Sequence, residues 1–87
     1  MTKAESEVIK HFGLTIDQIN AGGSARTVSS ARCVLVALLV HLDKLDTTEI
    51  GKIIGKHAHT VEYLVTRGVR MEEYKNARRN YIKAVSE

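Results

Sequence analysis

Apolar residues along the chain recur at three- and four-residue spacing, which is typical of amphipathic helices. The most apolar stretch runs from Ala31 to Leu42, and its Val and Leu side chains would cover nearly the whole circumference of a helix. A β-strand is the competing interpretation of a Val-rich run, but a length of about twelve residues favours a helix. We therefore predict a buried central helix over 31–42, with Ser29 or Ser30 as its N-cap.

Two helices are predicted before the central one. Residues 4–12 form the first, and Gly13 follows as its C-terminal stop. Thr15 and Gln18 have the spacing of a capping box at the start of a short second helix, which ends at 21–23. A flexible loop then leads to the central helix.

Three more helices are predicted after a turn at 43–45. Asp46 and Glu49 repeat the capping-box pattern, with Asp46 capping and Glu49 reaching back, and Gly55 closes the short helix that they start. The next helix starts three or four residues later, and Gly68 weakens its middle by about 1 kcal/mol relative to Ala. The last helix is expected to bury Met71, Tyr74, Tyr81, Ile82 and Val85 and to expose Lys75, Arg78, Arg79 and Lys83. The pattern predicts a single all-α domain of five or six helices over residues 1–87.

Composition removes several classes of protein. The chain has 87 residues, and Cys33 is its only cysteine, so an intramolecular disulfide is excluded and a disulfide-rich secreted scaffold with it. The longest apolar stretch, 33–40, is far shorter than the ~20 residues of a membrane span. The first residues lack the apolar run of a signal peptide. We expect a soluble cytoplasmic protein that does not bind membranes.

Charge is unevenly distributed along the chain. The net charge is +3, and the net-positive segments 24–42, 51–61 and 74–87 alternate with acidic ones. If these three segments met on one face, that face would suit nucleic acid. Charge runs are more often only solvated faces, so charge alone leaves this open.

Residues 46–67 have the form of a helix-turn-helix, with a short capped helix, a glycine turn and a second helix that starts with polar residues. In such a motif the second helix projects its first side chains into the DNA major groove. Here these would be His57, His59 and Thr60, with Lys56 beside them. An ordinary pair of antiparallel helices with a solvated helix start is the alternative interpretation.

From Glu7 to about Val69 the chain resembles the C-terminal DNA-binding domain of the bacterial replication initiator DnaA. The matching residues are Phe12-Gly13-Leu14-Thr15, Ala31-Arg32, and the gapless run Glu49-Ile50-Gly51-Lys52-Ile53-Ile54-Gly55-Lys56-His57-Ala58-His59-Thr60-Val61. In that family a basic-loop arginine enters the minor groove, an arginine that opens the next helix grips phosphate, and the recognition helix reads bases.

Carried over by position, Arg32, His59 and Thr60 match these roles, and Arg26 lies in the expected loop, two residues beyond the minor-groove position at Ser24. The candidate DNA contacts are Arg26, Arg32, Thr48, Lys52, Lys56, His57, His59, Thr60 and Arg67. The chain departs from the family where His57-Ala58 replaces Arg-Asp and Val61 replaces a second Thr. Ala58 removes a carboxylate that could accept from a cytosine amino group.

The resemblance implies sequence-specific binding of double-stranded DNA, in a replication- or transcription-regulatory role near the nucleoid. The family's Gly-rich phosphate loop is absent from the sequence, so we expect no ATP, no ATPase activity and no cofactor. His57 and His59 lie on different sides of a helix, which argues against a metal site. We also expect no enzymatic activity. The alternative function is a protein-interaction adaptor that has lost DNA binding and docks a partner, or a second copy, through its Tyr-bearing C-terminal helix.

Overall fold

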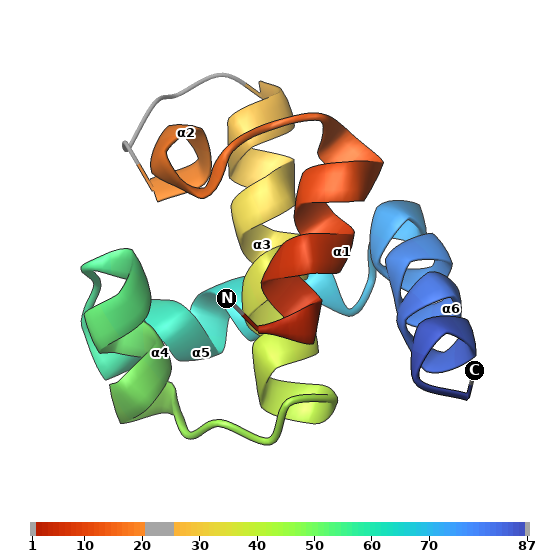
Figure 1. Ribbon diagram of the computed structural model, residues 1–87. Coiled ribbons are helices and arrows are strands. Elements are labelled where there is room, and N and C mark those ends of the chain that lie inside the picture. The colour runs from red at the N-terminus through yellow and green to blue at the C-terminus, as the bar shows by residue number, and fades with distance from the viewer. Residues whose placement is uncertain (1, 21–25, 87) are drawn as a thin grey trace.

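The computed structural model describes residues 2–20 and 26–86, which are all-α and contain no strand. Figure 1 shows the six helices of these residues. They are α1 (Lys3–Phe12), α2 (Ile16–Asn20), α3 (Arg26–His41), α4 (Thr47–Ile54), α5 (Ala58–Gly68) and α6 (Glu72–Ser86). The predicted fold class is confirmed. The predicted end of the second helix at 21–23 lies outside the described residues.

Helix α3 is the centre of the fold, as predicted, because each of the other five helices packs against it. Its residues from Cys33 to Leu39 are all buried. The predicted start of this helix was wrong, since α3 begins at Arg26 rather than after Ser29 or Ser30. Arg26 is therefore the first residue of a helix and not a loop residue. None of the described helices is long and apolar enough to cross a membrane.

Local capping interactions fix most of the helix ends. Thr15 and Gln18 form the predicted reciprocal pair, with N–H to side-chain oxygen distances of 2.8 and 3.1 Å. Asp46 accepts from the Glu49 N–H at 2.8 Å, which lowers the pKa of the Asp46 carboxyl. The predicted return bond from the Glu49 side chain is not formed among the described residues. Gly55 ends α4 in the left-handed conformation, with φ 69°.

Gly68 has a packing role that helix propensity does not indicate. It is the last residue of α5 rather than a weak point in its middle. A Cβ atom built on Gly68 would overlap the Cys33 carbonyl oxygen and lie 3.0 Å from the Ala37 Cβ. The absence of a side chain therefore lets α5 pack closely against α3.

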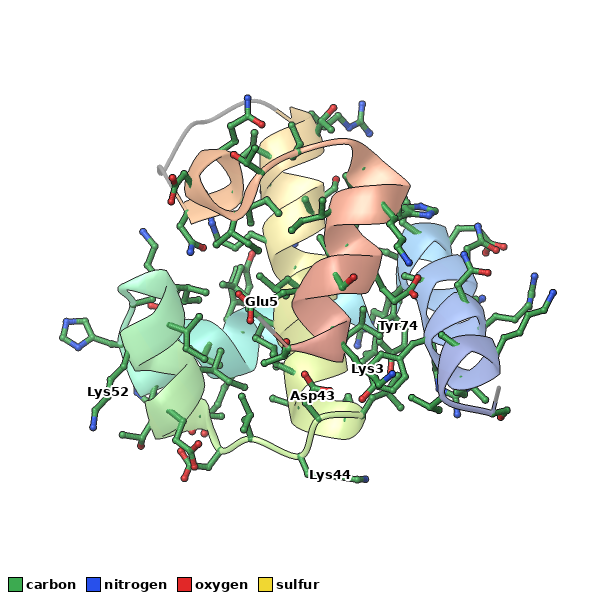
Figure 2. The ribbon with its side chains drawn as sticks, in the orientation of Figure 1. Lys3, Glu5, Asp43, Lys44, Lys52 and Tyr74 are labelled. Atoms are coloured by element: carbon green, nitrogen blue, oxygen red, sulfur yellow. The ribbon has the colours of Figure 1, made fainter. Side chains whose placement is uncertain are left out.

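Helix α6 packs against α1 and α3 through one narrow face. Tyr74, Ala77 and Tyr81 are buried on this face, while the predicted cations are exposed. Figure 2 shows Tyr74 between α6 and the rest of the fold. The prediction that Ile82 and Val85 are buried was wrong, since they are 39% and 48% exposed. Ile82 lies to one side of the Tyr74–Tyr81 ridge, and Val85 lies beyond its end, in the last turn of α6.

Candidate nucleic-acid interface

Helices α4 and α5 are joined by a turn that brings their backbones very close. The Lys56 N–H donates to the Gly51 carbonyl at 2.8 Å, and the Gly55 N–H also points to that carbonyl. A Cβ atom on Gly51 would lie only 2.5 Å from the Lys56 carbonyl oxygen. Glycine at this position thus permits the close approach, and the start of α5 is held at a fixed distance from α4. The short capped helix, the glycine turn and the second helix predicted within residues 46–67 are therefore all present.

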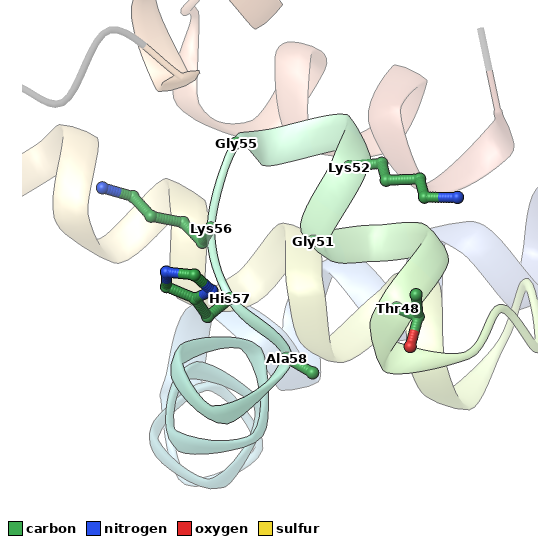
Figure 3. Close-up of a pocket in the computed structure, with 7 residues that line it drawn as sticks. All are labelled: Thr48, Gly51, Lys52, Gly55, Lys56, His57 and Ala58. Atoms are coloured by element: carbon green, nitrogen blue, oxygen red, sulfur yellow. The ribbon is translucent and has the colours of Figure 1, made fainter.

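A shallow hollow lies at the turn between α4 and the start of α5, as shown in Figure 3. Its lining residues are Thr48, Gly51, Lys52, Gly55, Lys56, His57 and Ala58. Lys56 and His57 extend to one side of the turn, while Lys52 and Thr48 lie on the other. The structure therefore brings together four of the candidate DNA contacts around Ala58, the first residue of α5.

The first turn of α5 presents polar side chains to solvent. The His59 side chain is 98% exposed and Thr60 is also exposed, whereas Val61 and Leu64 face the core. His57 occupies the N-cap position but makes no side-chain capping bond, so its imidazole is not committed to the helix. These three side chains can contact a partner without any loss of core packing.

Further along α5, Tyr63 and Arg67 form a pair that sequence reasoning recognised only in part. The Tyr63 ring is 60% exposed, and the Arg67 guanidinium carbon lies 5.7 Å from the ring centroid, which is cation–π distance. Arg67 was a candidate contact, but Tyr63 and the exposed Arg70 were not. Tyr63 and Arg67 follow His59 by four and eight residues, which places them opposite the buried residues of α5, and that spacing is present in the sequence. Arg70 lies beyond the end of α5.

One acidic side chain interrupts this surface. Glu62 lies 3.8 Å from His59, measured from the carboxylate to Nδ1, and both side chains are largely exposed. The contact is an ion pair only while His59 carries a proton. A carboxylate here opposes binding of any polyanion.

Arg32 and Arg26 lie apart from the hollow of the turn. The half-buried Arg32 is in the second turn of α3, not the first, and donates to the Ile19 carbonyl from Nε at 3.1 Å and Nη2 at 2.8 Å. It therefore anchors the end of α2. Arg26 lines a different hollow, with His11 and Glu73. The position matched to the family's minor-groove arginine, Ser24, lies outside the described residues.

The three net-positive segments do not share one face. In Figure 1, α4 and the start of α5 lie on one side of α3 and α6 lies on the other, with α1 and α3 between them. Among residues 2–20 and 26–86, the three segments therefore do not meet on one surface, and the basic surface of α4 and α5 is separate from that of α6.

Chemically reactive groups add no other site among the described residues. Cys33 is 1% exposed, and burial is the main cause that raises the pKa of its thiol, against smaller opposing effects of Arg67 and Arg32. No group of three His, Cys, Asp or Glu side chains within 2–20 and 26–86 could hold a metal ion.

Comparison with known proteins gave no relative: no protein-family model matches the chain, and a search of curated proteins found no match.

Proposed function

We propose that this protein binds double-stranded DNA sequence-specifically through α4 and α5, with the start of α5 in the major groove. The observation that carries the proposal is the geometry of the turn. Gly51 and Lys56 hold the two helices in close contact, while His57, His59 and Thr60 remain exposed at the N-terminus of α5. A helix-turn-helix needs a braced second helix with free polar side chains at its start.

The charges around the turn suit a phosphate backbone on both sides of a groove. Lys52 and Lys56 are exposed and extend to opposite sides of the turn. The candidate contacts Thr48 and His57 lie beside them. The exposed Arg67 adds a positive charge near the other end of α5. Phosphate contacts of this kind position a protein on the duplex without reading its sequence.

Base reading is assigned to His59, Thr60 and Ala58. Imidazole and hydroxyl groups can bond to base edges, and the Thr60 and Ala58 methyl groups can pack on a thymine methyl. The resemblance to the DnaA DNA-binding domain supports this assignment, since His59 and Thr60 match its base-reading positions. The replacement of its acidic reader by Ala58 implies a different recognised sequence. A regulatory role in replication or transcription at the nucleoid, without ATPase activity, follows from the same resemblance.

The proposal is tested by fluorescence anisotropy with labelled duplexes of mixed sequence. Each phosphate contact contributes about 0.9 to the log–log dependence of affinity on salt, so three to five contacts predict a slope of about −3 to −5. Lys52→Gln with Lys56→Gln should reduce the magnitude of the slope by about 2. The control is Lys10→Gln with Lys44→Gln, which removes the same charge from exposed positions outside α4 and α5. Equal losses in the two double variants would contradict the proposal.

A second variant separates reading from positioning. Thr60→Ala should relax the preference at one or two base pairs and leave the salt slope nearly unchanged, because it removes no charge. The base preference is measured by competition between duplexes that differ at single positions. A uniform loss of affinity for all of them would show that Thr60 does not read bases.

A further inference from the structure

The outer face of α6 is strongly basic. Between Tyr74 and Ser86 the helix has four cations and no acid, and all four are exposed: Lys75, Arg78, Arg79 and Lys83. Lys75, Arg79 and Lys83 follow one another at four-residue steps, so they form one line of about 12 Å along the helix. Among the described residues, only Lys75 has an acidic partner, Glu72, at 3.7 Å.

The orientation of this face is fixed by the opposite side of the helix. Tyr74, Ala77 and Tyr81 are buried against α1 and α3. The Tyr81 hydroxyl also donates to Asp43 Oδ1 at 2.5 Å, which ties α6 to the end of α3. The cations therefore point away from the fold, and their charge is not used for intramolecular packing.

This face lies away from the α4–α5 surface, with the α1 and α3 helices between the two (Figure 1). A duplex seated on the start of α5 therefore leaves the α6 cations free. We infer that α6 binds the phosphate backbone of a second DNA duplex, so that one domain bridges two duplexes. This inference rests on the proposed function of α4 and α5.

Duplex DNA fits the α6 face better than a membrane does. DNA carries one negative charge per ~1.7 Å of its axis, which gives a dense match for a line of cations. An amphipathic helix binds a membrane by inserting a wide apolar face. On α6, Tyr74, Ala77 and Tyr81 are buried against the fold, which leaves Ile82 and Val85 as its exposed large apolar side chains.

The experiment measures bridging by the intact protein. One short biotinylated duplex is held on beads, and a fluorescent duplex of the same mixed sequence is recovered only if protein joins the two. Arg78→Gln with Arg79→Gln should reduce recovery at least about fivefold at 50 mM salt, because two phosphate contacts are lost. Affinity for a single duplex in solution should change less than about twofold, since α5 still binds it. The control is again Lys10→Gln with Lys44→Gln, which should bridge like the wild type.

Several results would overturn the inference. Bridging by the Arg78/Arg79 variant at the wild-type level would show that α6 does not bind DNA. A protein dimer in sedimentation without DNA, lost on Ile82→Ser, would attribute bridging to paired copies of the chain. Binding of the wild type to phosphatidylglycerol vesicles, lost in the arginine variant while bridging persists, would assign the face to a membrane.

Failure of the inference differs from failure of the proposed function. If only the inference fails, Lys52→Gln with Lys56→Gln still weakens single-duplex binding, and the α6 variant leaves bridging intact. If the proposed function fails, the Lys52/Lys56 variant binds a single duplex like the wild type. If, in that case, the Arg78/Arg79 variant no longer binds a single duplex, α6 is the only DNA surface tested that binds. One surface cannot join two duplexes, so this result would also overturn bridging by one domain.

Discussion

Replacement of Gly51 by Ala tests whether the close turn between α4 and α5 controls both stability and DNA binding. The added Cβ would lie 2.5 Å from the Lys56 carbonyl oxygen, whereas ordinary contacts begin at 3.4 Å, so the turn must move by about 0.9 Å. Overpacking of this kind costs about 1–3 kcal/mol. The higher helix propensity of Ala returns about 1 kcal/mol. Because the clash is with backbone, which cannot turn aside as a side chain can, we expect the cost to lie at about 2–3 kcal/mol and the net loss of stability at about 1–2 kcal/mol.

The measurement is thermal unfolding followed by helical circular dichroism, together with anisotropy titration of a labelled duplex under conditions in which each variant is folded. A loss of 1 kcal/mol lowers Tm by about 4–8 °C in a domain of this size. Affinity for DNA should fall more than about tenfold, because a displacement of this size misplaces the start of α5 against the groove.

Gly55→Ala is the matched control for this experiment. It makes the same chemical change four residues away, at φ 69°, where a Cβ meets nothing within 4 Å. Backbone strain costs about 1–2 kcal/mol, so stability should fall to a similar extent. DNA affinity should be largely retained. A Gly51→Ala protein more stable than the wild type would refute the reasoning, as would equal effects of both variants on affinity.

Three further predictions concern the fold. Leu38→Ala removes a fully buried side chain from α3 and should cost about 2–5 kcal/mol, leaving so small a domain largely unfolded by circular dichroism; a well-folded variant would show that the core is misplaced. Asp43 raises the pKa of Tyr81 to about 12. The unfolded chain loses this proton near pH ~10, so stability should fall between pH 10 and 12, and Tyr81→Phe should flatten that fall in urea unfolding; parallel curves would contradict it. Arg32→Ala should lower stability by about 1.5–3 kcal/mol through loss of the bonds to the Ile19 carbonyl, whereas an unchanged urea midpoint would remove this anchoring role.

Local signals in the sequence predicted most of the helix boundaries. Thr15 and Asp46 start α2 and α4 because a side-chain oxygen can reach an N–H three residues ahead. Gly13 and Gly55 end α1 and α4 because they adopt the left-handed conformation. Each of these interactions lies within a few residues, so the pattern needs no knowledge of the rest of the fold.

Features that depend on distant contacts were not predicted. Gly68 reads as a weak helix position, and only the position of Cys33 in α3 shows why a side chain is excluded. Ile82 and Val85 fit the apolar periodicity of α6, but α1 and α3 cover only the Tyr74–Tyr81 ridge. Periodicity indicates which face of a helix is apolar and does not indicate how much of it a neighbour covers.

The candidate site was predicted in its centre and less well at its edges. Lys52, Lys56 and His57 do surround the turn, because the spacing within a helix-turn-helix sets their positions. Arg26 does not lie at the turn. It is the first residue of α3, which begins before its apolar run, and it lines a hollow with His11 and Glu73. Tyr63 was missed, although its four-residue spacing from His59 places it on the exposed face of α5.

The most direct test of the account is selection of bound duplexes from a random pool by the wild type and by Ala58→Asp. Ala58 is the first residue of α5 and lines the hollow of the turn, and an acid in the first turn of a helix is favourable, so the variant should fold. We expect a defined wild-type site with thymine opposite the Ala58 methyl group. In the variant, we expect a shift towards cytosine at that position, because a carboxylate accepts from the cytosine amino group. Identical base preferences in the two proteins would contradict the claim that the start of α5 reads DNA.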